Sequence, residues 1–441
     1  MSTITAKNFI DKLLFVTIAC AIVTCSYDIF LQVKISSFNI RFSVLCMIFA
    51  IFLFVFKAVL DRNTKIRMIA PFSLFMWVLI LILFVGNTHF LSRNILYIVW
   101  LIIYIFFIIA FNQINLQSSF IQIFKIYVYS FGFLGLIGII QFILFFVLGV
   151  NFYLEQVFES GIPRINAFCY EPSYFATFML TGFVINQFLI INKSKYFNFN
   201  FLLINQFFVL VSILLSTSKM VIPIVLFLLF FSSITDLIYK IFRNFSVYTK
   251  DLLLMPVIIF GFVFIIYMFL YKFEDISFLF AGSGVGGTVS HSVEGRSLAL
   301  EQTFQVFKKS PFVGCSLGGI PSSIGDLFGI VITNNETAKQ FEGMNIFVET
   351  LAGSGIIGFI FFLIFLISVF YYPYIQSRFL FKNREFIEEA ILIRSLFWSG
   401  VALLFMLNFN QNILRPYLWI HLGFLSLSFY YSKQIFNQNK L

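Results

Sequence analysis

Long, unbroken apolar runs recur along this chain and constrain its fold more than any other feature. Hydrophobic residues make up 60% of the 441 residues and charged residues only 11%, whereas soluble domains carry about 25% charged residues. Apolar runs of this length are typical of transmembrane helices. Lipid offers no hydrogen-bond partners to the backbone, so continuous apolar runs favour helices, whereas a membrane barrel would require alternating polarity. The sequence therefore predicts an all-α, polytopic membrane protein.

Twelve transmembrane spans are expected, within a single membrane domain that comprises residues 1–441. The spans are predicted at 13–31, 42–60, 68–86, 95–111, 126–149, 173–191, 200–216, 220–239, 252–271, 346–370, 388–407 and 416–431.

The distribution of Lys and Arg predicts the orientation of these spans. With the N-terminus inside, 18 of the 29 basic residues fall in inside segments, and every inside loop carries at least one. Basic residues are retained on the cytoplasmic side of a membrane, so both termini are expected in the cytoplasm. This topology accounts for most of the net charge of +10, and no nucleic-acid partner is expected.

The outer loop 272–345 has a pattern of its own. Its Gly-rich start, 282–290, is expected to be flexible. Apolar residues at helical spacing predict an amphipathic helix from Glu294 to Lys309, which Ser310-Pro311 ends. After a Gly-rich turn, the stretch 321–341 is expected to be polar and irregular and to cover the outer surface as a lid.

Four outer segments contain polar residues that ordinary loops do not require: 164–178, 216–220, 295–319 and 344–359. In the first, Glu171 precedes a proline at the start of the sixth span, where an acid also has a structural role because it complements the helix dipole. In the second, Lys219 lies in a tight turn and is also explained as a snorkelling lysine at the membrane interface.

The third and fourth segments frame the long loop. Arg296 begins the amphipathic helix, where a cation is slightly unfavourable. Asn345 and Glu349 are four residues apart and share one face at the outer mouth of the tenth span. An ionisable group at such a position is a functional candidate. Close helix contact or a local break is expected at the glycines that follow, which are Gly353, Gly355 and Gly358.

Cys169 and Cys315 fall in predicted outer loops, where a disulfide is chemically feasible. The other three cysteines lie in apolar runs and are expected to be packing residues. No residue spacing indicates a metal site, and no cofactor is expected.

Taken in order on this topology, the four segments resemble the O-antigen polymerase and O-antigen ligase superfamily. The family pattern has an Arg before a Glu-Pro-Ser box, a Ser-Arg or Ser-Lys turn, a large outer loop that starts with Arg, and an Asn box followed by Gly-Ile-Ile-Gly. The corresponding positions here are Arg164, Glu171-Pro172-Ser173, Ser218-Lys219, Arg296, Pro311 to Gly318, Asn345 and Gly355-Ile356-Ile357-Gly358. Ligases usually place a His before the Asn box, and Met344 at that position favours a polymerase.

The resemblance implies a GT-C-like fold and a metal-independent glycosyltransferase in the cell inner (plasma) membrane, with a periplasmic active site. Its substrates would be oligosaccharide repeat units on undecaprenyl pyrophosphate, which it would join into surface polysaccharide such as O-antigen or capsule. A chain-length regulator and a flippase are implied as further partners, beside the lipid bilayer.

The resemblance also implies roles for particular residues. Arg164 and Arg296 are expected to clamp the pyrophosphate and stabilise its departure, with Lys219 assisting. Glu171 and Glu349 are equal candidates for the base that accepts the hydroxyl proton. The sugar-orienting candidates are Tyr170 and Asn345.

Two other functions are compatible with the sequence. One is ligation, in which a finished glycan is transferred to another acceptor through the same pyrophosphate clamp. The other is transport by a flippase-like protein, although the two repeated halves that many transporters show are not apparent here.

Overall fold

The computed structural model describes residues 3–35, 38–61, 65–114, 116–157, 161–218, 220–228, 291–409 and 413–438. The chain divides into two compact units, one formed by Met1–Ser216 with Leu298–Leu441 and the other by Thr217–Ser297. Of the second unit, the description covers only short stretches, in which residues 221–228 and residues 291–297, the start of α11 (His291–Lys309), are helical.

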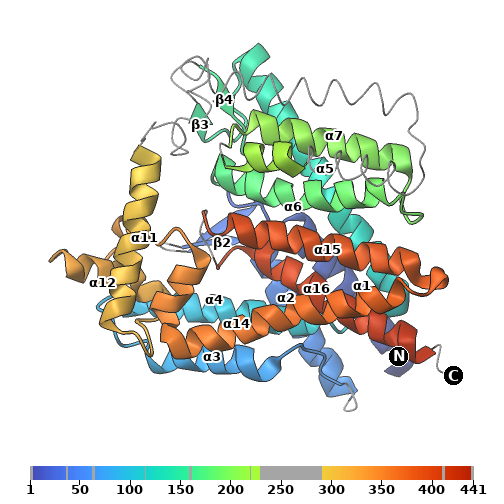
Figure 1. Ribbon diagram of the computed structural model, residues 1–441, viewed down its shortest axis with the longest axis horizontal. Coiled ribbons are helices and arrows are strands. Elements are labelled where there is room, and N and C mark those ends of the chain that lie inside the picture. Colours follow the sequence, from blue (N-terminus) through green and yellow to red (C-terminus); the bar gives the residue numbers. More distant parts are fainter. Residues whose placement is uncertain are drawn as a thin grey trace, which may run out of the picture. The chain divides into compact units, whose positions relative to one another are not determined.

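The larger unit is a bundle of long apolar helices (Figure 1). Its N-terminal helices are α1 (Thr3–Val23), α2 (Phe42–Leu60), α3 (Pro71–Leu83), α4 (Leu91–Phe111), α5 (Leu116–Leu148), α6 (Pro172–Ile191) and α7 (Phe199–Leu215). The later helices are α11 (His291–Lys309), α12 (Ile320–Leu327), α13 (Asn335–Lys339), α14 (Ile346–Leu380), α15 (Ile387–Met406) and α16 (Pro416–Gln438).

Every predicted span outside residues 217–290 coincides with a helix. The span 252–271 and most of 220–239 lie outside the described residues. Within the described parts of the chain, six helices are long and apolar enough to cross a membrane, and they comprise Phe42–Leu60, Leu91–Phe111, Ser119–Leu148, Pro172–Ile191, Ile346–Leu380 and Arg384–Met406. Two shorter apolar helices, α3 and α7, accompany them.

The first predicted span was misplaced along the chain. Helix α1 ends at Val23, whereas the prediction placed the span at 13–31. The chain leaves the helix before Asp28 because Asp28 enters ion pairs with arginines of other loops. The backbone N–H groups of Asp28 and Ile29 donate to the Phe168 carbonyl instead of continuing the helix.

Helix α16 forms the centre of the bundle. It packs against α4, α5, α14 and α15. Every residue from Arg415 to Ser428 is buried, so this helix has no exposed face along most of its described length. A helix that is buried all round takes small and apolar side chains on every face, and the sequence LGFLSLS, residues 422–428, supplies both.

The connections between helices meet at two ends of this unit. The loops predicted to be outer contact one another through side-chain hydrogen bonds, for example from Arg41 to Leu414, from Asn345 to Asn408 and from Asn94 to Cys315. The inner loops also meet, through contacts of Lys57 with Asp11, Asn112 with Arg67 and Ser194 with Glu388. The predicted alternation of loops between two sides is therefore confirmed for the described helices. We refer to the first set as the loop end and to the second as the terminus end.

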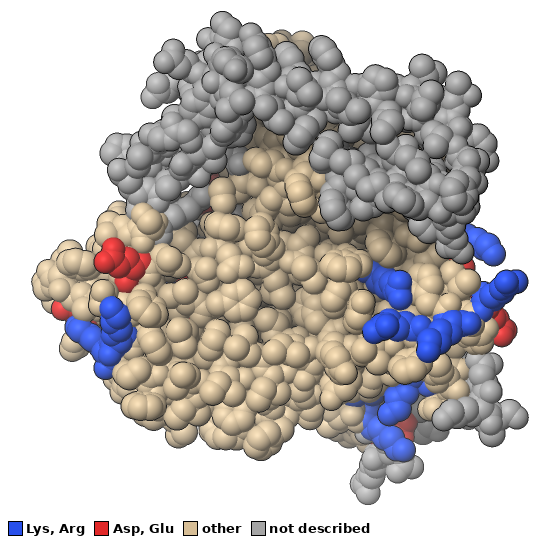
Figure 2. Space-filling view, viewed as in Figure 1, with Lys and Arg blue, Asp and Glu red and all other residues tan. Residues whose placement is uncertain are grey.

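Charged side chains follow the same division. In Figure 2 most Lys and Arg side chains gather at the end where Figure 1 places both termini, and the band between the two ends is uncharged on the face shown. Such a distribution is typical of a protein whose apolar band lies in a bilayer and whose basic loops remain on one side of it.

Short irregular elements occupy the loop end. Strands β1 (Gln32–Ile35) and β2 (Phe38–Arg41) form an antiparallel hairpin, and β3 (Gln156–Val157) pairs with β4 (Pro163–Arg164). The predicted amphipathic helix is confirmed as α11. The prediction that 321–341 is irregular was wrong in part, because α12 and α13 form there, the second beginning where the Asn334 side chain accepts from the Thr337 N–H.

Helix α14 is broken at Gly355, as the glycine pattern predicted. Gly355 has φ 61° and ψ −176°, which interrupts the helical hydrogen bonds. The preceding loop supplies the missing partners. The Cys315 and Ser316 N–H groups donate to the Ala352 and Gly353 carbonyls at 3.2 and 2.7 Å. Beyond the break, the Ile356 N–H donates to the Pro311 carbonyl at 2.8 Å. The loop segment 311–316 thus satisfies backbone groups that lipid could not satisfy.

Substitution of Gly355 by alanine is expected to destabilise the protein. An L-residue at this positive φ is strained, and the new Cβ would collide with the Phe312 backbone. Gly149 is a matched control because its φ is +66° and no neighbouring atom lies within 4 Å of the place that an alanine Cβ would take. We expect Gly149→Ala to lower the free energy of unfolding by about 1–2 kcal/mol and Gly355→Ala by about 3 kcal/mol or more. Thermal unfolding in detergent measures both, and equal melting temperatures would contradict this account.

Candidate functional site

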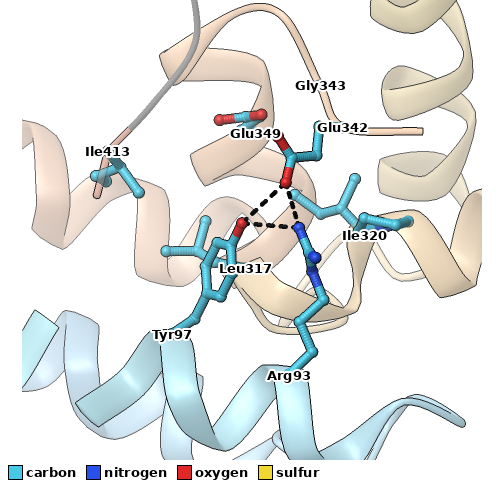
Figure 3. A pocket seen from close by; sticks show the side chains of 9 residues that line it. Arg93, Tyr97, Leu317, Ile320, Glu342, Gly343, Glu349 and Ile413 are labelled. Atoms are coloured by element: carbon cyan, nitrogen blue, oxygen red, sulfur yellow. Dashed lines mark hydrogen bonds and ion pairs between the residues drawn. The ribbon is translucent and has the colours of Figure 1, made fainter. Parts of the chain in front are cut away.

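A narrow cavity at the loop end is lined by several charged side chains (Figure 3). Its lining residues are Arg93, Tyr97, Leu317, Ile320, Pro321, Glu342, Gly343, Glu349 and Ile413. They come from α4, from the long loop, from the start of α14 and from the segment before α16. The free space between them is about enough for one water molecule.

Arg93 contacts three other polar side chains in and beside this cavity. Its side chain is buried, and one guanidinium nitrogen, Nη2, donates to the Tyr97 hydroxyl at 2.9 Å and forms an ion pair with Glu342. The other terminal nitrogen, Nη1, donates to the Asn335 amide oxygen at 3.1 Å. The Tyr97 hydroxyl also donates to Glu342 at 3.4 Å. A buried guanidinium needs such partners because its charge is costly to desolvate.

Glu349 lies on the opposite wall of the cavity and is only 8% exposed. Within the described part of the chain its carboxylate receives no hydrogen bond or ion pair, and its side chain lies 2.5 Å from the place that a Cβ on residue 343 would take. Glycine at 343 therefore lets the loop approach Glu349 closely. A buried carboxylate without a hydrogen-bond partner is energetically costly, so Glu349 is the predicted site residue for which packing offers the least explanation.

A second charged cluster, the Asp28 cluster, lies at the same end. Asp28 accepts a hydrogen bond from Arg415 Nη1 at 2.8 Å and forms an ion pair with Arg41, whose Nε lies 2.7 Å from Asp28 Oδ1. The Tyr170 N–H donates to the same carboxylate at 3.2 Å. Asp28 and Arg415 are both nearly completely buried, whereas the Arg41 side chain is 24% exposed. Two guanidiniums and one carboxylate leave this cluster with a formal charge of +1.

Arg415 is held in place on two sides. Its guanidinium carbon lies 3.5 Å from the centre of the Tyr174 ring, a cation–π contact. Burial alone would lower the pKa of Arg415, but Asp28 and Tyr174 raise it to above its ordinary value. The Nε atom of Arg415 is buried without a hydrogen-bond partner in the described structure. The cluster therefore keeps a cationic donor available.

Arg164 and Glu171 lie near this cluster. Glu171 is within electrostatic range of both Arg164 and Tyr174, and Tyr174 is in turn within range of Glu342. Arg164 is partly buried and donates to Gln156 at 2.7 Å. Burial lowers the pKa of Arg164 and the Glu171 carboxylate opposes this shift. These electrostatic influences extend from Arg164 through Glu171 and Tyr174 to Glu342.

The other described residues that were predicted for the site stabilise helix starts or lie at the surface. Glu171 is the N-cap residue of α6, and its carboxylate accepts from the Ser173 hydroxyl at 3.0 Å. Asn345 is the N-cap of α14, and its side chain accepts from the Phe347 and Val348 N–H groups. Tyr170 is 52% exposed, with the Lys339 ammonium 6.0 Å from its ring centre.

Two predicted residues lie beyond what the structure describes. Lys219 is outside the described residues, as is the side chain of Arg296, of which only the helical backbone in α11 is described. The predicted meeting of Arg164 with Arg296 thus stays a prediction.

Sequence reasoning missed several residues of both clusters, namely Arg41, Arg93, Tyr97, Glu342 and Arg415. The sequence did contain a signal that could have identified the three arginines as site residues. All three fall in loops or helix starts predicted to be outer, where the charge rule disfavours basic residues. A cation retained against that rule has another reason to be there.

Cys169 and Cys315 are free and buried, so the feasible disulfide is not formed. Burial raises the pKa of Cys315 to about 11 and keeps its thiol protonated at neutral pH. Among the described residues, no group of three or more His, Cys, Asp and Glu side chains lies together so that it could hold a metal ion.

Asn345→Ala is expected to lower the free energy of unfolding by about 1 kcal/mol through loss of the helix cap. Asn345→Asp is the matched variant, since aspartate caps helices equally well. If Asn345 has only a structural role, the aspartate variant keeps activity and the helix cap, and it loses only the Nδ2 donation to Asn408. Loss of activity with normal thermal stability in Asn345→Asp would instead indicate a direct contact with substrate.

A comparison with protein-family models found no match to this sequence, and a search of curated proteins found none.

Proposed function

We propose that this protein is a membrane glycosyltransferase that polymerises oligosaccharide repeat units carried on undecaprenyl pyrophosphate. The observation that carries the proposal is the Asp28 cluster, a buried site at the loop end with a formal charge of +1 and a guanidinium donor, Arg415 Nε, that has no described partner. A buried net charge is unfavourable unless an anion completes it. A lipid-linked diphosphate is an anion that reaches such a site from the membrane.

The proposed chemistry requires stabilisation of a leaving diphosphate. An acceptor hydroxyl attacks the anomeric carbon of the donor sugar, the bond from that carbon to the diphosphate oxygen breaks, and the bonding electrons leave with the diphosphate. Guanidinium groups suit this task because their N–H groups pair with phosphate oxygens in a fixed geometry. Arg415 and Arg41 are the residues best suited to it, and Arg164, within electrostatic range of Glu171, is a further candidate. In a partly dry site, such contacts strengthen as charge develops.

The acceptor hydroxyl must also lose its proton. Of the two carboxylates proposed from sequence, Glu349 is the better base because no described group already uses its carboxylate. Glu171 accepts a hydrogen bond from Ser173 and begins a helix, which accounts for it structurally. In this proposal the Asp28 cluster holds the diphosphate and the base lies in the Arg93 cavity, and Tyr174 is within electrostatic range of both Arg415 and Glu342.

The position of the charges favours an enzyme over a transporter. Among the described spans, Arg93 and Glu349 lie in the first turns of α4 and α14, at the loop end. Transport of a charged substrate through the bundle would favour ionisable groups near the middle of several spans. We therefore propose twelve spans with the loop end outside, supported by the basic residues that gather at the terminus end in Figure 2.

Arg415→Lys is expected to reduce polymer formation by about 100-fold, because lysine keeps the charge and loses the fork that pairs with a diphosphate. Arg394→Lys is a matched control at the terminus end, where Arg394 covers the Phe381 ring. Each variant is expressed in a deletion strain, and the surface glycan is separated on a gel. Single repeat units on the acceptor are expected for Arg415→Lys, and also for Arg164→Ala and Arg296→Ala. Normal polymer at normal expression from all three would contradict the proposal, and unattached long polymer would indicate a ligase.

Glu349→Gln is expected to abolish polymer, since glutamine has nearly the same shape but cannot accept the proton. Glu171→Gln is the comparison, and its predicted effect is a small loss of stability with polymer retained. Purified enzyme with lipid-linked repeat units gives the rate of each variant directly. The opposite ranking of the two variants would assign the base to Glu171.

A further inference from the structure

Glu349 is enclosed by the long loop, so that no molecule of sugar size reaches it in this structure. The cavity around it has room for about one water molecule. Its roof comes from Glu342 and Gly343, and its floor from α4 and the loop residues Leu317 and Ile320. Any reaction at Glu349 therefore requires part of this enclosure to move.

The structure distinguishes a fixed part of the long loop from a part that can move. Residues 311–316 are fixed because their backbone is hydrogen-bonded to α14 on both sides of the Gly355 break. Gly314 and Gly318 also contact the backbones of Gly353 and Arg93 too closely for any side chain. Movement of this part would leave backbone groups of a membrane helix unsatisfied.

Residues 334–342 are attached differently. Their described backbone hydrogen bonds all lie within the segment, for example from Ala338 to Asn334 and from Phe341 to Ala338. Among the described contacts, side chains hold the segment on the bundle. Arg93 makes two of these contacts, to Asn335 and to Glu342. Ala338, on the short helix α13, is completely buried. Displacement of this segment therefore breaks no described backbone hydrogen bond to another element.

We propose that residues 334–342 form a lid over Glu349, which the Arg93–Glu342 ion pair latches shut. Arg93 belongs to α4 and Glu342 to the lid, so the pair joins a fixed element to a movable one. Both side chains are largely buried, at 5% and 15% exposure, and an ion pair of this kind holds firmly only while both partners are present. Gly343, directly after the lid, provides the pivot beside Glu349.

The latch also places two carboxylates in the same cavity. Glu342 pairs with Arg93, whereas Glu349 lines the same cavity within electrostatic range of both residues (Figure 3). Two neighbouring carboxyl groups in a low-dielectric cavity disfavour each other's ionised form. The closed lid therefore depends on Arg93, the cation that pairs with Glu342.

Cysteine accessibility tests the latch. Glu349→Cys is introduced together with Cys20→Ser, since Cys20 is exposed whereas the other four cysteines are buried. A membrane-impermeant maleimide is applied to membranes that contain the protein. We expect slow modification in this reference protein and a roughly tenfold or greater increase after addition of Glu342→Gln. Asp326→Asn is the matched control, because Asp326 lies on α12, pairs with the exposed His89, and is outside the lid. Equal rates with and without Glu342→Gln, or an equal increase in Asp326→Asn, would overturn the proposal.

A second measurement leaves Glu349 intact. Spin labels are attached at Glu336→Cys in the lid and Asn87→Cys before α4, both exposed positions. A single distance is expected in the native background, and a second, longer one in Glu342→Gln and in Arg93→Gln. Because Arg93→Gln removes both the Glu342 and the Asn335 contacts, the double variant is expected to open no further than Arg93→Gln alone. An unchanged distance in Glu342→Gln would refute the latch. Neither readout uses substrate or activity, so the latch can fail while the proposed function stands, and the reverse.

Discussion

The requirement that every backbone group find a partner within the protein controls how this molecule is built. Helix α14 breaks at Gly355 in a part of the chain where lipid cannot supply hydrogen bonds. The loop segment 311–316 fills the break and is fixed by doing so. Because Leu317 and Ile320 follow directly, the docked segment forms one wall of the cavity around Glu349. A local defect in one helix thus determines where the long loop lies.

The loop end carries two charge clusters of opposite sign. Asp28 with Arg41 and Arg415 has a formal charge of +1. Arg93 with Glu342 and Glu349 has a formal charge of −1 when both glutamates are ionised. Separate cationic and anionic subsites are what the proposed reaction needs, since one product leaves as an anion and the other reactant loses a proton. The ring of Tyr174 is covered by Arg415 and is within electrostatic range of Glu342.

Helix starts and chemical groups coincide at this end of the bundle. Asn345 caps α14, and one turn later the same helix presents Glu349 to the cavity. Glu171 begins α6, and three residues later that helix presents Tyr174 to Arg415. In both cases the first turn is anchored, so the side chain that follows is held in a defined direction. A polar box at a helix start can therefore contain a structural residue and a functional one side by side.

The sequence alone determined the membrane class, the positions of nearly all described spans and the alternation of loops between two ends. These follow from hydropathy and charge, which act locally and leave a pattern along the chain. The sequence also indicated Glu349 and the break among the α14 glycines, because an acid and an unusual glycine run interrupt an apolar pattern. Tertiary structure decided which carboxylate each arginine pairs with. Asp28 pairs with Arg415 across almost the whole length of the chain, as well as with the nearby Arg41, and Arg93 pairs with Glu342 across more than half of it. Such pairs depend on which helix ends lie side by side, and helix packing in a bundle leaves no periodic signal in the sequence from which the partners can be named.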